Sequence, residues 1–316
     1  MKTKAGENYQ RLIVAVAGLP ATPTAVAHPC DDAALAGAVD TAKMGIITPI
    51  LVGPRHKIAN VAAAGNVDIA AYEVVDAEHS HAAAEKAVAL IREGRAEMLM
   101  KGSLSTDELL GAVVKRDTGL RTARRLSHCF IMDVPGHTNV LIITDAAINI
   151  FPTLADKVDI VQNAIDLAHA LKIEKPKVAI LSAMETVNPK LDSTVEAAAL
   201  CKMADRGQIT GGVLDGPLAL DNAISPDAAR IKKITGSVAG QADILVVPDL
   251  EAGNMLAKNL TFLAKADAAG LVLGARVPII LTSRADSVRS RMASCAAAVL
   301  YAAARRRVTA AALPAA

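Results

Sequence analysis

The sequence predicts an α/β protein whose sheets are largely parallel. Short runs of Val, Ile and Leu alternate with helical patterns along most of the 316 residues, and such alternation gives a right-handed α/β fold. The apolar runs are uninterrupted, which suits strands that are covered on both faces. The chain is 52% hydrophobic but only 2% aromatic, so Ala, Val, Leu and Ile must build the core. Its length favours about two domains.

The predicted strands are short apolar runs that end at Gly, Pro or polar residues. The first, residues 12–16, follows a basic start and imitates a secretory signal. However, Glu7 interrupts the basic region, and Pro20 and Pro23 follow the short run, so a strand is the better interpretation. The later expected strands cover residues 49–53, 72–76, 97–102, 129–134, 140–146, 177–183, 211–217, 243–249, 270–275 and 278–283.

The clearest predicted helix covers residues 154–173. Its apolar residues recur at spacings of 4, 3, 4 and 3 and therefore share one face: Leu154, Val158, Val161, Ile165 and Ala168. Ser105 and Glu108 form the pattern of a capping box at the start of another helix. The other expected helices cover residues 32–45, 80–94, 106–115, 193–206, 250–267 and 286–307.

The charge balance argues against two classes of partner. Lys and Arg number 34 and Asp and Glu 32, so a net charge of +2 gives no bulk attraction to nucleic acid or to an anionic membrane. Aromatic residues are too few to stack on single-stranded nucleic acid. No apolar run reaches the roughly 18–20 residues of a membrane span. We therefore expect no nucleic-acid partner and no membrane partner.

The thiols and imidazoles do not form a recognisable metal pattern. Dispersed cysteines favour a reducing compartment and buried structural roles, so we expect a cytoplasmic protein. His79 and His81 lie near an expected helix start, where we interpret them as surface capping residues rather than a metal pair. No C-x-x-C pair and no zinc spacing occurs among the cysteines, which are Cys30, Cys129, Cys201 and Cys295.

Polar residues that follow an apolar strand are candidate site residues, because ligands of open α/β sheets bind beyond the carboxyl ends of the strands. In the segment 278–287, Thr282, Ser283 and Arg284 follow an apolar run. Asp286 then opens a long helix. A hydroxyl, a guanidinium and free helix amides around one point form a cradle for phosphate. The same residues would also serve as an ordinary N-cap beside a surface arginine.

The segment 99–110 is the second candidate. Lys101 emerges at a strand end, Gly102 permits close approach of a backbone, and Ser103 supplies a hydroxyl before a helix. This arrangement has the style of a phosphate-binding loop, but G-x-x-x-x-G-K-[ST] is absent, which argues against nucleotide hydrolysis. A capped turn is the alternative interpretation.

Three further segments place polar residues after apolar strands, and each would also be explained by ordinary turn chemistry. Neither G-x-G-x-x-G nor G-x-S-x-G occurs, so the sequence supports neither a dinucleotide fold nor an α/β-hydrolase. The candidate residues are Thr144, Asp145 and Asn149 in 143–154, Asp215, Asp221 and Asn222 in 215–225, and Asn254, Lys258 and Asn259 in 247–260.

Several segments, taken together and in this order, resemble the phosphate acetyltransferase/phosphate butyryltransferase family. The resemblance covers nearly the whole chain, and its last three segments are specific when they occur together. The chain looks most like the phosphotransacylase part of bifunctional enoyl-CoA hydratase/phosphate acetyltransferase proteins. The matching segments are LMKGS (99–103), ITDAAINIFPTL (143–154), PKVAILSAMETVNPK (176–190), ALCKMADRGQITGG (199–212), DGPLALDNAIS (215–225), NLTFLAKADAAGLVLGARVP (259–278) and LTSRADS (281–287).

The resemblance implies reversible transfer of an acetyl group between acetyl phosphate and coenzyme A, with release of inorganic phosphate. Coenzyme A is then a substrate, and no cofactor, metal or covalent enzyme intermediate is required. The resemblance also implies a homodimer whose chain forms two three-layer α/β/α domains around an interdomain cleft, as in isocitrate and isopropylmalate dehydrogenases. Mapped onto this sequence, residues 1–143 with 276–316 form the first domain and 144–275 the second.

The resemblance also assigns roles to individual residues. Ser283 matches the family serine that hydrogen-bonds the reacting groups, and Arg284 offers a planar fork to phosphate or to the carbonyl oxygen. Lys101, Gly102 and Ser103 match a phosphate-side loop. The remaining matches are Ser127, near the acyl-phosphate pocket, and Asn149, Asp221 and Asn259, at motif positions that line the cleft. Thr144, which follows the strand before Asn149, is also expected to bind substrate.

One family pattern is not matched. Acetyl-type members have S-R-G-C with an Asp seven residues after the Ser, which is the proposed base for the thiol. Here Asp286 occupies the Cys position and Ser290 the Asp position. We hypothesise that Asp286 is the base, with a structural N-cap as the alternative. The S-R-A-D pattern is closer to the butyryl branch, so the choice between acetyl and butyryl stays open.

Two other functions are alternatives. A dehydrogenase of the isocitrate or hydroxythreonine-phosphate type would need NAD and metal-binding carboxylates, and loops 143–154 and 215–225 offer no convincing set of three. A non-catalytic acyl-CoA-binding protein is favoured slightly by the missing Asp. Turnover of an acyl phosphate and coenzyme A without metal would separate these alternatives from the transferase.

Overall fold

The computed structural model describes residues 6–281 and 287–311, and its contacts divide the chain into two compact units. The terminal unit comprises Tyr9–Arg124 and Ala269–Ala316, and the middle unit comprises Met1–Asn8 and Arg125–Ala268. The family resemblance predicts domain boundaries further along the chain, after residues 143 and 275. The contacts assign residues 127–144 to the middle unit because strands β5 and β6 pair with each other there.

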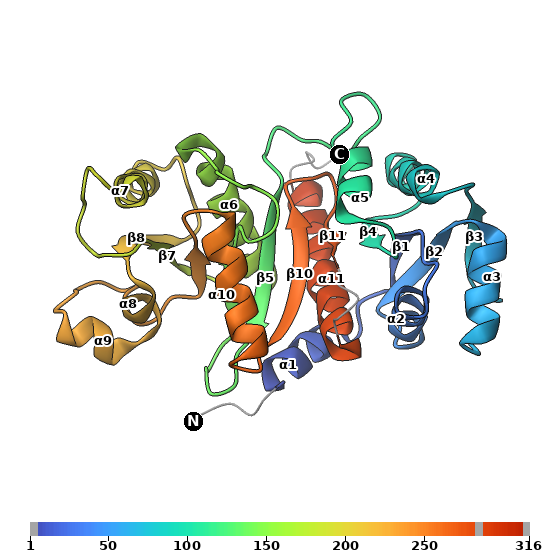
Figure 1. Cartoon of the computed structure of the whole chain (residues 1–316), viewed down its shortest axis with the longest axis horizontal. Coiled ribbons are helices and arrows are strands. Elements are labelled where there is room, and N and C mark those ends of the chain that lie inside the picture. The colour runs from blue at the N-terminus through green and yellow to red at the C-terminus, as the bar shows by residue number, and fades with distance from the viewer. Residues whose placement is uncertain (1–5, 282–286, 312–316) are drawn as a thin grey trace. The chain divides into compact units, whose positions relative to one another are not determined.

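The terminal unit contains a mixed, largely parallel sheet (Figure 1). Its strand order is β3-β2-β1-β4-β11-β10, and all neighbours are parallel except β10, which is antiparallel to β11. Strands β1 and β2 are almost entirely buried, as strands covered on both faces require, whereas β3 at the edge of the sheet is not. The strands are β1 (Thr22–Ala27), β2 (Ile47–Gly53), β3 (Glu73–Asp76), β4 (Met98–Lys101), β10 (Asp267–Leu273) and β11 (Ile279–Ile280).

Helices cover both faces of this sheet. Helices α4 and α5 pack together on one face, and α2 and α11 contact each other on the opposite face (Figure 1). The expected capping box of Ser105 and Glu108 is confirmed at the start of α5, and His79 caps α4 by accepting a hydrogen bond from Ala82 N. The helices are α1 (Glu7–Val16), α2 (Asp32–Lys43), α3 (Arg55–Ala64), α4 (Ser80–Arg92), α5 (Thr106–Val113) and α11 (Val288–Ala311).

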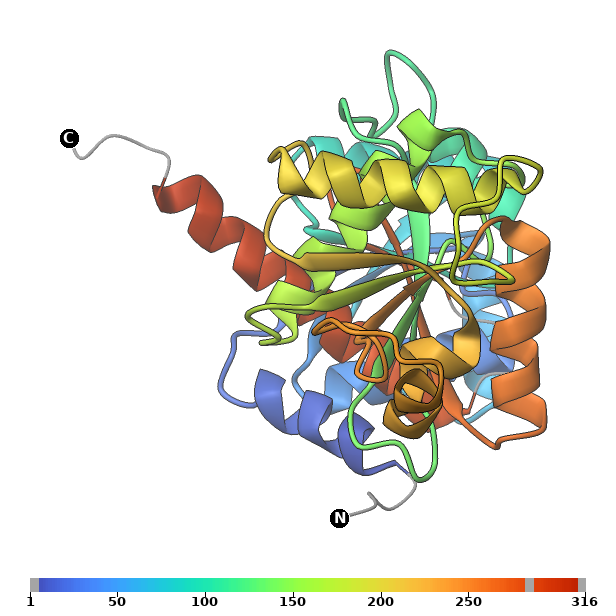
Figure 2. The ribbon, with the colours of Figure 1, turned by 90° about the vertical axis from the view of Figure 1, so that its left-hand side faces the viewer.

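The middle unit has the strand order β5-β6-β9-β7-β8, in which β5 and β6 are antiparallel and the other neighbours are parallel. Helix α7 lies on one side of β7 and β8, and α8 and α9 lie on the other (Figure 2). The strands are β5 (Ser127–Asp133), β6 (Leu141–Thr144), β7 (Lys177–Leu181), β8 (Val213–Leu218) and β9 (Ile244–Val246). The helices are α6 (Leu154–Ala170), α7 (Asp192–Asp205), α8 (Leu220–Ile224), α9 (Pro226–Ile231) and α10 (Leu250–Phe262).

Helix α6 confirms the predicted amphipathic pattern and adds a buried ion pair. Val161, Ile165 and Ala168 of the predicted face are fully buried. Thr153 and Asp156 form a capping box at its start. Lys157 is also buried, and its ammonium group pairs with the carboxylate of Glu196 on α7. A lysine is buried at this position because its charge has a partner.

The predicted strand at residues 12–16 is wrong, because these residues form the end of helix α1. The burial pattern explains the difference: Tyr9, Leu12 and Val16 are buried, whereas Val14 is 61% exposed. This spacing matches one face of a helix, and packing of that face outweighs the strand preference of Ile and Val. The first strand is β1 instead, and residues 25–27, part of the apparent signal, lie in it.

The other predicted strands and helices are present, although most are one to several residues shorter than expected. Helices α3, α8 and α9 were not predicted. Cys129 and Cys295 are buried as expected, while Cys30 and Cys201 are half-buried. Among the residues that the structure describes, no helix combines the length and the apolar character that crossing a bilayer requires.

Candidate functional site

The carboxyl ends of β1 and β4 meet at one edge of the terminal unit's sheet. The parallel register pairs Ala27 with Lys101, so His28 and Gly102 leave the sheet side by side. The backbone N–H of Gly102 donates to Ala27 O (2.9 Å), and that of Ser103 donates to His28 O (2.8 Å). These bonds extend the pairing past the end of both strands.

Gly102 is required by this contact. A Cβ atom at Gly102 would lie 2.4 Å from both Ala27 O and His28 O, and 2.6 Å from His28 C. These are backbone atoms held by the sheet, so they cannot move aside easily. The predicted close approach at Gly102 is therefore to the chain's own backbone after β1.

Ser103 contacts the residues that follow β1. Its Oγ donates to His28 O (2.8 Å), lies 2.9 Å from His28 Nδ1, and accepts a bond from Cys30 N (3.3 Å). Burial raises the pKa of the Cys30 thiol to about 11, so this thiol is protonated at neutral pH. Burial, and next the positive charge of Lys57, lower the pKa of His28. The sequence missed His28 as a site residue.

Lys101, at the end of β4, is half-buried, and its ammonium group donates to Gly102 O (3.2 Å). The parallel register of β4 with β11 pairs Met100 with Ile280, so Leu281 reaches the same edge as Lys101. Ser283, Arg284 and Asp286, which the sequence places next, lie outside the described residues.

Ser290 occupies the position at which the family pattern has an aspartate. It lies in the first turn of α11 and is only 5% exposed. Its backbone N–H and its Oγ both lie 3.1 Å from the Ser287 hydroxyl, which caps the turn. Ser290 therefore has a structural role at the helix start.

In the middle unit, the Asp145 carboxylate organises the loop after β6. Its Oδ1 accepts hydrogen bonds from the backbone N–H groups of Ala147 (2.9 Å) and Ile148 (3.1 Å). Its Oδ2 accepts bonds from Asn149 N (3.2 Å) and Asn149 Nδ2 (2.6 Å). Thr144, also buried, donates to His128 O (2.8 Å). The structure brings Asp145 and Asn149 together in one buried network, and the neighbouring Thr144 binds the backbone of β5 instead.

Arg125 connects this network to the surface. Its Nε donates to Asn149 Oδ1 (2.8 Å), and its guanidinium forms an ion pair with Asp156 (3.2 Å). The side chain of Arg125 is 52% exposed, so a cation lies at the protein surface next to Asn149. The sequence did not single out Arg125, although TARRLSH (122–128) places two arginines directly before a predicted strand.

Ser127 is fully buried and accepts a hydrogen bond from Asn163 Nδ2 (2.8 Å). Its hydroxyl joins β5 to α6 in this structure. Asn163 also donates to Arg125 O (3.0 Å), so it fixes the strand start and the arginine together. Ser127 and the backbone of Arg125 are therefore linked through the side chain of Asn163.

His128 is a second histidine that the sequence missed. It is 2% exposed, its ring stacks edge-on against Phe130 with centroids 4.4 Å apart, and its Nδ1 has no hydrogen-bond partner within the described ranges. Burial lowers the pKa of His128 to about 4, against the opposing effect of the Asp145 carboxylate. The ring is therefore neutral at physiological pH.

Among the remaining predicted positions, Asn254 of α10 donates to Ala146 O (3.4 Å) in the Asp145 loop. Asp215, Asp221, Asn222 and Asn259 make no contact with these clusters that the structure describes. Asp221, at the start of α8, and Asn259, on α10, are exposed. Asn222 is buried and donates to Glu185, which also pairs with Lys232 (2.7 Å). Burial raises the pKa of Asp215, which lies within β8.

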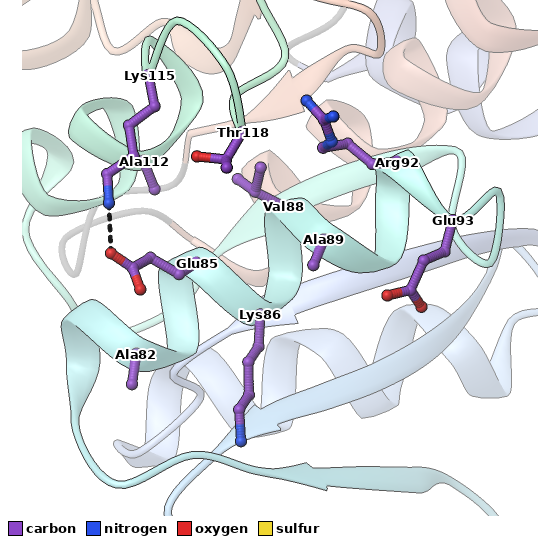
Figure 3. A pocket seen from close by; sticks show the side chains of 10 residues that line it. All are labelled: Ala82, Glu85, Lys86, Val88, Ala89, Arg92, Glu93, Ala112, Lys115 and Thr118. Atoms are coloured by element: carbon purple, nitrogen blue, oxygen red, sulfur yellow. Dashed lines mark hydrogen bonds and ion pairs between the residues drawn. The ribbon is translucent and has the colours of Figure 1, made fainter.

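A groove on the described residues lies elsewhere (Figure 3). It has a volume of about 590 Å³ between α4 and the segment that follows α5. Lys115 forms an ion pair with Glu85 of α4 across this groove. Arg92 donates to the carbonyl oxygens of Asp117 and Gly119. No predicted site residue lines this groove. The described residues also contain no cluster of three His, Cys, Asp or Glu suited to a metal.

A family model described as "Phosphate acetyl/butaryl transferase" matches residues 80–299. The match includes the Lys101 loop, the Asn149 loop and the start of α11. The chain therefore belongs to the phosphate acetyl/butyryl transferase family, and the family predicted from the motifs is confirmed.

Individual relatives are similar over nearly the whole chain. A phosphate acetyltransferase of Rhizobium meliloti is 68% identical over 305 residues, which are 96% of this chain and 96% of the relative. A phosphate butyryltransferase of Clostridium beijerinckii is 43% identical and covers 94% of this chain and 98% of the relative. The crystal structure of a branched-chain phosphotransacylase from Enterococcus faecalis is 32% identical, with a TM-score of 0.77, over 89% of this chain and 99% of that one.

The substitution Gly102→Ala tests the close approach at the β1–β4 edge. We expect a loss of about 3 kcal/mol of unfolding free energy, because the new methyl group overlaps two backbone carbonyls. Gly111→Ala in α5 is the control: a Cβ there meets no atom within 4 Å, so a gain of up to about 1 kcal/mol is expected. Urea unfolding measures both, and equal midpoints for the two variants would contradict the packing argument.

His128 makes stability depend on pH. The unfolded histidine takes up a proton near pH 6.5, whereas the buried native ring does so only near pH 4. The free energy of unfolding should therefore fall as pH drops from about 6.5 to about 4. His128→Gln should show a smaller fall in this window, while His56→Gln, at an exposed position, should keep it. Unfolding curves at several pH values measure the effect; an unchanged slope in His128→Gln would refute it.

Proposed function

We propose that this protein catalyses reversible transfer of an acetyl group between acetyl phosphate and coenzyme A, with butyryl or branched-chain acyl groups as the alternative substrates. The observation that carries the proposal is the 68% identity to a phosphate acetyltransferase over 96% of both chains. The 43% identity to a phosphate butyryltransferase keeps the alternative open. In this proposal coenzyme A, acyl phosphate and inorganic phosphate are the partners.

The acyl transfer is proposed to take place at the edge of the sheet where β1, β4 and β11 end. Three adjacent parallel strands end there, and ligands of α/β sheets bind at such ends. Neighbouring strands are about 4.8 Å apart, so Leu281 lies beside Lys101 at this edge. We place the acyl phosphate at this edge, with Lys101 as a cation for its phosphate. A cleft between two domains, as the family resemblance implies, stays a prediction.

Within this proposal, Ser283 and Arg284 act on the reacting groups. The guanidinium of Arg284 neutralises the phosphate and stabilises the oxyanion that forms when the thiolate attacks the carbonyl carbon. The Ser283 hydroxyl donates to the same oxygen atoms. In the middle unit, Asn149 and Arg125 are the polar groups proposed to contact the substrate, whereas Thr144 and Ser127 hold the loop and strand behind them.

An assay of acetyl-CoA formation from acetyl phosphate and coenzyme A, in the presence of a metal chelator, tests the function. We expect turnover without added metal, and a loss of about 10²–10³ in kcat for Arg284→Ala. Arg116→Ala, at an exposed position after α5, is the matched control and should keep full activity. Parallel rates with butyryl phosphate decide the acyl preference. Binding of coenzyme A without turnover would contradict the proposal and support an acyl-CoA-binding protein.

We also propose that the protein is a homodimer that pairs through α10 of the middle unit. Large apolar side chains are exposed on this helix and at its end: Met255 (65%), Phe262 (60%) and Leu263 (76%). Ile150 and Phe151, 61% and 76% exposed, lie beside the start of α10, because Leu250 N donates to Ile150 O. Exposed apolar patches of this kind mark surfaces that bind protein.

Light scattering tests the pairing. The wild-type protein should have twice the 32.6 kDa mass of one chain, and the double substitution Phe262→Glu with Leu263→Glu should give a monomer. Ile231→Glu, 77% exposed on α9, is the control and should leave the dimer intact. A wild-type mass equal to one chain at micromolar concentration would contradict the proposal.

A further inference from the structure

We propose that His28 is the proton acceptor for the coenzyme A thiol and that Ser103 holds its ring in the tautomer that can accept. The inference rests on the proposed acyl transfer and supplies it with a base. The thiolate, not the thiol, is the effective nucleophile, so the reaction needs such a group. His28 follows β1 directly and lies at the same edge as Lys101.

The hydrogen bonds of Ser103 determine the tautomer of His28. The serine hydroxyl has one proton, and its Oγ lies 2.8 Å from His28 O, which can only accept. We assign the proton to the contact between these two oxygen atoms. With this assignment, His28 Nδ1, 2.9 Å from the same Oγ, is the donor in that contact. Nε2 is left with the lone pair, which is the form in which an imidazole accepts a proton.

The backbone at His28 holds the ring in place. His28 has a φ of +55°, a left-handed conformation that costs a residue other than glycine about 1 kcal/mol. The bond from Ser103 N to His28 O and the close approach of Gly102 maintain this conformation. Conformations of this kind gather at functional sites because they direct a side chain that regular structure would turn elsewhere. The ring is only partly buried.

The charges around His28 keep it neutral. Burial is the largest cause of its lowered pKa, and Lys57 of α3 is the second. Asp31, which caps α2, and Glu108 of α5 act in the opposite direction. The result is a pKa below the usual value near 6.5, so the ring is unprotonated at physiological pH. A base must be in this form before it meets the thiol.

The proton balance of the step is complete. Nε2 takes the thiol proton while the sulfur atom forms a bond to the carbonyl carbon of acetyl phosphate. The bond from that carbon to the bridging oxygen then breaks, and its electron pair leaves with phosphate. The imidazolium returns the proton to a phosphate oxygen, so His28 ends the cycle neutral. Ser290 cannot replace it, because a hydroxyl in a helix turn is not a base at neutral pH.

His28→Asn tests the assignment with little change in shape. Asparagine tolerates the left-handed conformation, and its Nδ2–H can donate to Ser103 as Nδ1–H does, but it cannot accept the proton. We expect kcat for acetyl-CoA formation to fall by about 10²–10⁴, with KM for coenzyme A changed less than about threefold. The wild-type rate should decline at acidic pH as His28 becomes protonated, and this limb should vanish in the variant. His56→Asn, exposed on α3, is the matched control.

Two further variants separate His28 from its neighbours. Ser103→Ala frees the tautomer without removing the base, so kcat should fall by about tenfold while the acidic limb remains. Asp286→Asn should also retain this limb if His28 is the base. Loss of the acidic limb in Asp286→Asn and its retention in His28→Asn would overturn the assignment in favour of Asp286.

Nitrogen-15 NMR of the imidazole rings provides a readout that does not depend on activity, and its main result comes from the wild-type protein. In the wild-type protein His28 should carry its proton on Nδ1, and Ser103→Ala should shift the ring toward the Nε2–H form. A wild-type His28 protonated on Nε2 overturns the assignment. Active wild-type protein with an unaffected His28→Asn variant overturns it while leaving the transferase intact. Inactive wild-type protein overturns the proposed function and, with it, this assignment.

Discussion

The close approach of two backbones at Gly102 is the constraint on which the candidate site depends. The space between Gly102 and the carbonyl groups of Ala27 and His28 is too small for a Cβ atom. Because glycine has none, the pairing of β1 and β4 continues past the ends of both strands. Ser103 then reaches the residues after β1, and His28 is held in a left-handed conformation. The same register fixes where Lys101 ends its strand. One missing Cβ thus positions a cation, a hydroxyl and an imidazole at one edge.

The middle unit reaches a similar result through a carboxylate. The buried Asp145 accepts four hydrogen bonds from the loop after β6, which satisfies a charge that would otherwise be costly to bury. Asn149 is the outer member of this network and holds the guanidinium of Arg125 at the surface. Polar groups therefore gather at strand ends in both units, and backbone groups support them in each.

The sequence predicted the strands well because their apolar runs are uninterrupted, and it predicted α6 because its apolar spacing is regular. It failed at residues 12–16, where Ile and Val suggest a strand but Tyr9, Leu12 and Val16 share a helix face. That error had a consequence for the site. The sequence does not reveal β1, so it gives no reason to place a site at the carboxyl end of that strand, and it does not predict His28. The run AVA (25–27) followed by His28 and the cap at Asp31 was the available signal.

The direction of a side chain is a second property that could not be predicted from the sequence. Motif matching selected Ser127 and Thr144, but a pattern of residue types does not show that both side chains are directed into the fold. Arg125, which such inward residues support, is the group that reaches solvent. The same motif contains buried residues that support the loop and residues that face solvent. The structure is needed to distinguish the two kinds.

A crystal structure of the protein with coenzyme A bound would test the central claim most directly, namely that acyl transfer takes place at the β1–β4–β11 edge. The account predicts the thiol sulfur atom within about 3–4 Å of His28 Nε2, with Lys101 on the same side of the sheet. A sulfur atom at the carboxyl ends of β7 and β8, out of reach of both residues, would contradict it.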